Sequence, residues 1–244
     1  MPSERPDDQD RQYRPVMGME HGYKWLRVQN NPVFAAMVEM MDQTVGTIRE
    51  ALREAGIAEE TIIVFYSDNG GLATDHPSTP NFPLRVGKGW MYEGGVRVPL
   101  IVYWPGVTEP GGVSDTPVTS TDFYDTIAEM TGTPVPGNQG TDGRSPVPLL
   151  RQTGTIHRDR LYWHYPHYHG AGNTPSGAVR SGPYKLVQYF ATEEVELYNL
   201  YQDASEQRDV SDERPALTDS LLERLRSWRD QVGAQMPKPN PNYE

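Results

Sequence analysis

One apolar run, Thr61 to Tyr66 (TIIVFY), constrains the fold more than any other stretch of this chain because it shows no polar alternation after its first residue. Such a run is typical of a strand that is buried on both faces of a parallel sheet. The run ends abruptly at Ser67-Asp68-Asn69-Gly70-Gly71, and open α/β sheets bind their ligands where the carboxyl ends of strands meet loops. A second apolar run, Val98 to Tyr103, ends at Pro105-Gly106. The sequence therefore predicts two core strands that frame one polar loop system.

Two places in this loop system carry candidate site residues. Asp68 and Asn69 offer carboxylate and amide oxygens, the hard ligands that suit Ca²⁺. Lys88 stands between Gly87 and Gly89, so its ammonium lies on a loop with little steric cover. Each feature also has an ordinary interpretation, since Asp-Asn-Gly is a common turn sequence and a lone lysine is commonly a solvated surface group.

An amphipathic helix is predicted before the first strand. Asn31 suits the N-cap, Pro32 suits the first helical position, and Gly56 suits the stop. Between them, apolar residues recur at spacings of three and four up to Leu52. We expect this helix to cover one face of the sheet, with its methionines in the core.

The sequence changes character after residue 155. Short strands are expected at 161–165, 178–180, 184–190 and 195–198, the last three as an antiparallel meander, followed by an amphipathic helix over 215–232. We therefore expect two domains. Residues 1–155 would form an α/β part, with 1–30 as an extended lead-in, and residues 156–244 a small antiparallel sheet with one packing helix.

Composition excludes several classes of function. The net charge of −11 gives no basic excess with which to bind nucleic acid. There is no cysteine, which excludes disulfides and thiolate metal sites. No apolar run reaches the length of a membrane span.

A histidine cluster lies in the segment YWHYPHYHG, which contains His164, His167 and His169. Histidines alone can bind zinc, but a cluster of this kind on a loop is a weak metal signal. The alternative is a substrate rim, in which imidazole and aromatic groups stack on and hydrogen-bond to a sugar or aryl ring. On this interpretation His164 and His167 are candidate substrate-binding residues.

The combination of motifs resembles the sulfatase family of the alkaline-phosphatase-like superfamily. SDNGG follows a buried strand, and P-L-R-x-G-K-G-x-x-x-E-G-G-x-R-V-P and then W-P-G come after it. Further similar segments are MVEMMDQTVG, TDGRSPVPLL and ELYNLYQDASE, so the resemblance spans roughly Asn31 to Trp228. It implies a partial alkaline-phosphatase-like α/β fold, with a mostly parallel sheet flanked by helices and a small C-terminal antiparallel sheet.

The resemblance also implies an activity and its site residues. Asp68 and Asn69 would be ligands of Ca²⁺, and Lys88 would be a catalytic residue that contacts the sulfate group of a sulfated small molecule or glycan. Glu93 and Arg97 would hold in place the Gly-rich loop, which runs from Gly87 to Gly95. The implied function is that of a sulfuric ester hydrolase, an arylsulfatase-like enzyme whose substrate is expected to be a sulfated carbohydrate. For a full-length family member a periplasmic or secreted location is expected.

Part of the family pattern has no counterpart in this chain. Sulfatases carry a Cys- or Ser-x-Pro-x-Arg segment whose first residue becomes the formylglycine nucleophile. The nearest match, Ser181-Gly182-Pro183-Tyr184-Lys185, ends in lysine, and we interpret it as a hairpin turn. The early aspartate pair that completes the family's metal site is missing too. The chain is therefore expected to be a C-terminal portion without turnover of its own.

Two other functions remain open at this stage. One is a phosphatase or phosphodiesterase of the same superfamily, which usually employs a two-zinc site. The other is a non-catalytic module that binds anionic glycans or a partner half-chain. The sequence leaves the oligomeric state open.

Overall fold

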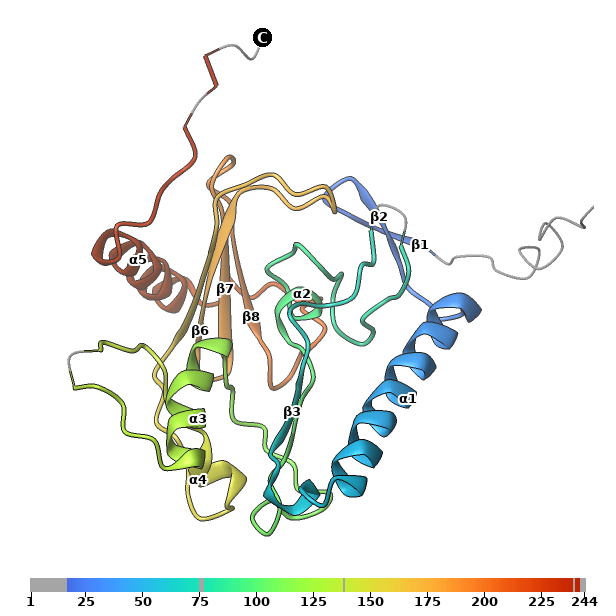
Figure 1. Ribbon diagram of the computed structural model, residues 1–244. Helices are drawn as coiled ribbons and strands as arrows, with labels where there is room; N and C mark the ends of the chain where they lie inside the picture. Colours follow the sequence, from blue (N-terminus) through green and yellow to red (C-terminus); the bar gives the residue numbers. More distant parts are fainter. Residues whose placement is uncertain (1–16, 75–76, 138, 239, 242–244) are drawn as a thin grey trace, which may run out of the picture. The chain divides into compact units, whose positions relative to one another are not determined.

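The computed structural model describes residues 17–74, 77–137, 139–238 and 240–241, drawn in colour in Figure 1. The chain forms two compact units, each assembled from separate stretches of sequence. The first contains the chain up to Asp42 together with Ser67–Val98 and Arg160–Glu244, and the second contains Gln43–Tyr66 and Pro99–Asp159. These units group residues by contact, and the expected domain division at residue 155 stays a prediction.

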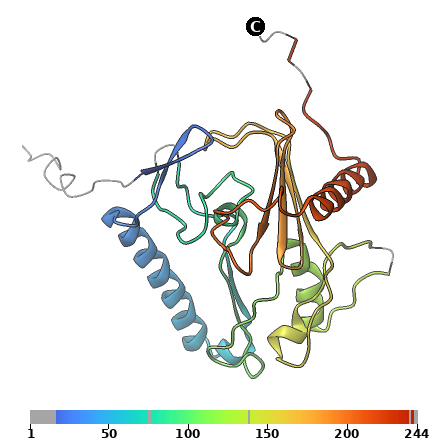
Figure 2. The same ribbon diagram turned by 180° about the vertical axis from the view of Figure 1, so that it is seen from behind.

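A four-stranded antiparallel sheet is the centre of the first unit. Its strands, in spatial order, are β5 (Leu161–Tyr165), β6 (Ser176–Ser181), β7 (Tyr184–Tyr189) and β8 (Val195–Asn199). Helix α5 (Pro215–Gln231) lies along one face of this sheet in both Figure 1 and Figure 2. The meander and its packing helix are confirmed. So is the hairpin turn at Ser181, which pairs with Tyr184 around Gly182 at φ 55°.

Strand alternation gives this sheet two different faces. Val179, Leu186 and Leu197 are buried on the face that α5 covers, where Leu221 and Leu225 complete the core. The opposite face packs against the Gly-rich loop and an N-terminal hairpin. Its core contains Trp25, Val86, Trp90, Tyr92, Ala178, Val187, Tyr189 and Tyr198. The sheet therefore forms the base on which the Gly-rich loop lies. This loop carries Lys88 and is also called the Lys88 loop.

The N-terminal hairpin corrects the expectation of an extended lead-in over residues 1–30. Strands β1 (Met17–Glu20) and β2 (Tyr23–Leu26) pair through a two-residue turn, His21-Gly22, with φ of 43° and 82°. Leu26 is fully buried. Strands of four residues are too short for a period to show in the sequence, and residues 1–16 lie outside the described residues.

The second unit corrects the expectation of a parallel sheet. Strands β3 (Ile63–Tyr66) and β4 (Leu100–Tyr103) do form at the two apolar runs, but they pair antiparallel and, among the described residues, only with each other. Val64 is 41% and Ile101 62% exposed. An unbroken apolar run indicates that both faces of a strand are suited to burial, and it carries no information about strand direction.

Helix α1 (Pro32–Glu54) forms as predicted, but its apolar residues are not buried. Asn31 Oδ1 accepts hydrogen bonds from the backbone N–H groups of Val33 (3.0 Å) and Phe34 (3.2 Å), as an N-cap should. Met37 is 61% exposed, and no residue of the helix is buried. This corrects the expectation that its methionines lie in a core, because an amphipathic pattern shows which face favours burial and not what covers it.

The remaining helices are short. They are η3 (Ala58–Glu60), α2 (Glu93–Val96), η4 (Ser120–Asp122), α3 (Phe123–Thr131) and α4 (Val147–Leu150). Thr119 and Asp122 form a capping box at the start of η4, and Gly132 at φ 67° ends α3. Asp122 also forms a salt bridge with Arg158, so its role is structural.

Candidate functional site

The loop after β3 places Asp68 and Asn69 at the end of the strand. Asp68 is exposed and Asn69 is half-buried. The Asn69 N–H donates to Asp68 Oδ1 at 2.9 Å, and Ser67 Oγ donates to the Asn69 carbonyl at 3.0 Å. These bonds are those of a tight polar turn, and they leave the second oxygen of the Asp68 carboxylate available to another ligand.

This turn is clamped to the Lys88 loop by backbone contacts. The Lys88 N–H donates to the Gly71 carbonyl at 3.0 Å, and the Gly70 N–H donates to the Gly95 carbonyl at 3.0 Å. A Cβ on Gly70 would lie 1.7 Å from the Gly94 carbonyl oxygen, so only glycine fits there.

The Asn81 side chain fastens the same junction. Its Oδ1 accepts from the Gly71 N–H at 2.8 Å, while its Nδ2 donates to the carbonyls of Gly71 (2.9 Å) and Val86 (2.7 Å). The structure therefore joins Asp68, Asn69 and Lys88 in one rigid loop system.

Lys88 itself is exposed and forms no salt bridge with another described residue. Gly89, at φ +89°, and the buried Gly87 flank it. An exposed ammonium on a rigid loop is a suitable contact for an anionic group.

The side-chain oxygens of Asp68 and Asn69 are of the type that calcium binds, but they are too few to hold the ion by themselves. A carboxylate and an amide oxygen are hard ligands, but Ca²⁺ takes six to eight oxygens. The described residues contain no group of three or more His, Cys, Asp or Glu side chains that could hold a metal ion. Asp68 and Asn69 could therefore hold only part of a calcium coordination shell.

The three clustered histidines have different surroundings. His164 lies against Phe190, with a ring separation of 5.4 Å, and its Nε2 hydrogen-bonds to the Gln235 carbonyl at 2.8 Å. His167 is exposed, with its ring 5.5 Å from that of Tyr165. Neither forms a hydrogen bond or ring contact with the described residues of the Lys88 loop, so their role at a substrate rim stays a prediction. His169, which belongs to the cluster but was not among the candidate substrate-binding residues, packs against Gly89.

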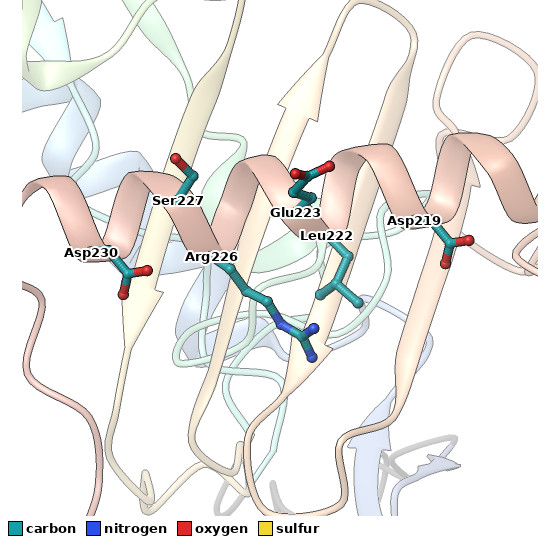
Figure 3. A pocket seen from close by; sticks show the side chains of 6 residues that line it. All are labelled: Asp219, Leu222, Glu223, Arg226, Ser227 and Asp230. Carbon is teal, nitrogen blue, oxygen red and sulfur yellow. The ribbon is translucent and has the colours of Figure 1, made fainter.

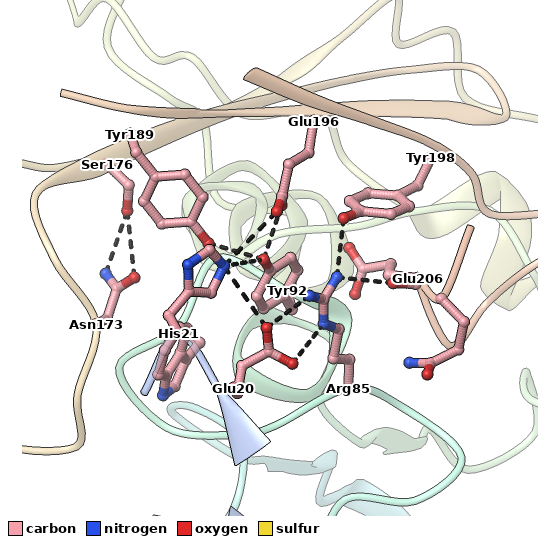
Figure 4. A network of polar contacts seen from close by, with 12 residues as sticks. Glu20, His21, Arg85, Tyr92, Asn173, Ser176, Tyr189, Glu196, Tyr198 and Glu206 are labelled. Carbon is pink, nitrogen blue, oxygen red and sulfur yellow. Dashed lines mark hydrogen bonds and ion pairs between the residues drawn. The ribbon is translucent and has the colours of Figure 1, made fainter. Parts of the chain in front are cut away.

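A buried polar network anchors the Lys88 loop to the sheet beneath it (Figure 4). The Arg85 guanidinium donates to both oxygens of Glu20 at 2.9 and 2.6 Å and lies 3.9 Å from the ring centroid of Tyr92. It also donates to Tyr198 Oη at 2.8 Å. Burial opposes the charged form of Arg85, but the hydrogen bonds to Glu20 prevail and raise its pKa. Arg85 thus ties the loop to the hairpin and to β8.

His21, from the turn of the hairpin, enters the same network (Figure 4). Its Nε2 lies 3.1 Å from Tyr92 Oη and 3.6 Å from Glu196 Oε1. The Glu196 carboxylate raises the pKa of His21 against the opposing effect of burial. Burial by itself would raise the pKa of Glu196, but hydrogen bonds from His21 and Tyr92 lower it overall.

A buried ionic triad holds the start of α2. Lys185 Nζ lies 3.0 Å from Glu93 Oε1 and 3.0 Å from Glu206 Oε1, and all three side chains are at most 2% exposed. The Glu93 N–H also donates to Glu206 Oε2 at 2.6 Å. Burial opposes the charge on Lys185, but the two carboxylates raise its pKa overall. Glu93 is therefore placed to support the loop, as the sequence indicated, and Arg97 lies at the edge of this cluster, 4.0 Å from Glu93.

A shallow hollow on α5 is a separate feature of the first unit (Figure 3). All its lining residues come from one helix, and none is a predicted site residue: Asp219, Leu222, Glu223, Arg226, Ser227 and Asp230. Its charges are mixed, which favours no particular ligand. No described helix is long and apolar enough to cross a membrane.

The sequence motifs, together with loops that pack on an antiparallel sheet, are consistent with a partial alkaline-phosphatase-like fold. Comparison with known proteins places this chain among the sulfatases. The sulfatase family model matches residues 2–133, and a model described as N-sulphoglucosamine sulphohydrolase, C-terminal, matches residues 86–231. Each match covers more than half of the chain. The chain belongs to the sulfatase family.

Named relatives agree with this assignment. A sulfatase of Formosa agariphila is 40% identical over 218 residues, which are 80% of this chain and 39% of the relative. Human arylsulfatase A is 39% identical over 152 residues, 59% of this chain and 28% of that enzyme. The chain thus spans about two fifths or less of these relatives.

Solved structures show the same partial coverage. Ps i-CgsB in complex with k-i-k-neocarrahexaose matches with a TM-score of 0.71 and 31% identity, covering 83% of this chain and 44% of that one. BT4656 in complex with D-glucosamine-2-N,6-O-disulfate matches with a TM-score of 0.67 and 25% identity, covering 82% and 40%.

Proposed function

We propose that this chain supplies one part of the active site of a sulfuric ester hydrolase that acts on a sulfated carbohydrate. The observation that carries the proposal is the clamp between the Asp68-Asn69 turn and the Lys88 loop, together with membership of the sulfatase family. The relatives that crystallised with a carrahexaose and with a disulfated glucosamine support a carbohydrate as the substrate.

In this proposal Lys88 binds the sulfate group. Its exposed ammonium stabilises negative charge on a sulfuryl oxygen or on the leaving oxygen, where charge develops as the ester bond breaks. The rigid backbone clamp holds Lys88 in place before substrate arrives, so little reorganisation is needed during the reaction. Asp68 and Asn69 would contribute oxygens to a calcium ion, which when bound would polarise the sulfate.

The nucleophile is proposed to come from polypeptide outside these 244 residues. The chain contains no cysteine and no Ser-x-Pro-x-Arg segment that could give formylglycine. The exposed apolar residues of α1, such as Met37, and those of the β3–β4 pair, such as Ile101, support this because each element by itself leaves apolar side chains on which further structure can pack. A two-stranded apolar ribbon is marginal by itself.

Turnover of a chromogenic aryl sulfate tests the proposal. The purified 244-residue chain should show none. A joined polypeptide, in which the part of the Formosa agariphila sulfatase that this chain does not match is fused to it, should hydrolyse the ester and lose activity when calcium is chelated. Turnover by the isolated chain would contradict the proposal, and so would a joined polypeptide that cleaves only phosphate esters and requires zinc. Calcium-independent glycan binding with no turnover by the joined polypeptide would favour a non-catalytic module.

A further inference from the structure

His169 is held against the residue next to Lys88. A Cβ built on Gly89 would meet three atoms of the His169 ring, Nδ1, Cγ and Cε1, at 2.5, 2.8 and 2.9 Å. The ring therefore occupies the space that a side chain at position 89 would take. Nε2 is not among these three nearest atoms.

The turn that carries His169 is fixed to the protein on several sides. The His169 N–H donates to the Asn173 carbonyl at 2.9 Å, and the Gly172 N–H donates to the His169 carbonyl at 2.9 Å. The carbonyl of Ala171, inside this turn, accepts from Trp90 Nε1 at 2.9 Å and from Thr74 Oγ1 at 2.5 Å. These hydrogen bonds tie the turn that carries the ring to Trp90 of the Gly-rich loop and to Thr74.

The hydrogen bonds of His169 determine which ring nitrogen carries the proton. The backbone N–H of Ala171 points at Nδ1 at 2.9 Å, and a backbone N–H can only donate. Nδ1 is therefore the acceptor, and in the neutral ring the hydrogen is on Nε2. Nε2 has no hydrogen-bond partner among the described residues and is not a buried atom. The ring thus presents an N–H donor from a position against Gly89, the residue that follows Lys88.

His164 and His167 do not share this combination. Nε2 of His164 already binds the Gln235 carbonyl, and His167 contacts only the ring of Tyr165 among the described residues. Only His169 of the three is both fixed by the fold and in contact with the Lys88 loop.

We propose that His169 is a substrate-binding residue whose Nε2–H donates to an oxygen of the sulfated sugar anchored at Lys88. This rests on the proposed function, because it takes the sulfate to be bound at Lys88. An ammonium and a neutral N–H donor together suit a ligand that is anionic at one position and carries a further oxygen acceptor beside it, as a sugar sulfate does.

Two substitutions of His169 distinguish the effect of losing the Nε2–H donor from the effect of disturbing the local structure. The amide of His169→Gln reaches the position of Nε2, whereas the amide of His169→Asn reaches only that of Nδ1. Both variants can accept from the Ala171 N–H or repack locally, but only Gln restores a donor at the outer edge of the ring. His157→Asn, the same substitution at an exposed histidine outside the cluster, serves as a matched control.

The measurement is binding of D-glucosamine-2-N,6-O-disulfate, and of unsulfated glucosamine for comparison, to the full 244-residue chain, followed through the histidine ring ¹⁵N signals. We expect His169→Asn to weaken binding roughly 10-fold, the loss of one hydrogen bond to a charged or polar acceptor, and His169→Gln to stay within about 3-fold of the parent. His157→Asn should have no effect. In the free chain the His169 ring should show the Nε2–H tautomer.

The outcomes distinguish this inference from the proposed function. If His169→Asn binds as well as the parent while Lys88→Ala weakens binding, the inference fails and the anchoring of sulfate at Lys88 stands. If Lys88→Ala has no effect on binding, the proposed function fails with it. If the parent chain shows no change of the His169 signals at roughly millimolar ligand, the inference is overturned, and turnover by the joined polypeptide still decides the function.

Discussion

Replacing Lys185 tests how the Lys88 loop is held to the sheet. Its side chain is fully buried between Glu93 and Glu206, at 3.0 Å from each. Lys185→Met keeps most of the side-chain volume but removes the cation that lies between the two buried carboxylates, which leaves Glu93 with only the more distant guanidinium groups of Arg180 (3.9 Å) and Arg97 (4.0 Å). Removing one partner of a buried ionic group costs about 3–5 kcal/mol, so we expect the free energy of unfolding to fall by that amount. This is a large share of the roughly 5–15 kcal/mol that holds a typical domain together.

Urea unfolding followed by tryptophan fluorescence measures this loss, because the Trp163 ring lies 5.9 Å from the Lys185 ammonium. The triple variant Lys185→Met with Glu93→Gln and Glu206→Gln removes the charges together and should recover most of the stability. Lys24→Met, at an exposed position, should change the free energy of unfolding by less than about 0.5 kcal/mol. A loss below about 1 kcal/mol for Lys185→Met would refute the view that this cluster is a critical support of the loop.

Three further predictions concern the same loop system. Glu196 raises the pKa of His21 above 6.5, so the stability that protonated His21 adds is complete at lower pH and is lost as the pH rises through the raised pKa. His21→Gln should remove this pH dependence from the urea midpoints measured at about pH 5.5 and about pH 8.5. The same pH dependence in the variant as in the parent chain would contradict this prediction. Lysine in Arg85→Lys cannot form the bidentate hydrogen bond to Glu20 or stack on the Tyr92 ring, so a thermal melt should show that the protein has lost about 2 kcal/mol of stability. A variant as stable as the parent chain would count against this network. Gly70→Ala should lower the free energy of unfolding by about 1–3 kcal/mol, because the added Cβ clashes with the Gly94 carbonyl. Gly46→Ala, in open space on α1, should instead raise it by about 0.5–1 kcal/mol. Equal effects of the two variants in urea unfolding would refute the close approach at Gly70.

Local pattern predicted most of the regular elements. Asn31 and Gly56 mark the ends of α1 by capping chemistry that depends only on neighbouring residues. The meander over 176–199 follows from short apolar strands separated by turn residues such as Gly182. The hairpin β1–β2 was missed because its strands are four residues long, and its turn, His21-Gly22, is not one of the common two-residue turn pairs.

The direction and the burial of the apolar elements could not be predicted in the same way. The runs at 61–66 and 98–103 indicate strands with two apolar faces, yet the structure pairs them antiparallel and leaves Ile101 62% exposed. What covers a face depends on residues distant in sequence, and α1 shows the same limit.

The roles of the predicted site residues stay predictions, and the side chains that support their loops were not predicted from the sequence. Asp68, Asn69 and Lys88 follow from motifs, and the structure clamps their loops together. Arg85 and Lys185 have no such signal, because their partners lie up to about 120 residues away in the chain. His169 has only its place in a histidine cluster, and its contact with Gly89 emerges only when the two segments pack.

The most direct test of the account is the turnover number of the joined polypeptide with and without Lys88. If Lys88 binds the sulfate in the transition state, Lys88→Ala should lower kcat for an aryl sulfate roughly 100- to 1000-fold, while Lys24→Ala leaves it unchanged. Full turnover by the Lys88→Ala variant would show that the loop carrying Lys88 is not part of a sulfate-ester site, and would contradict the central claim.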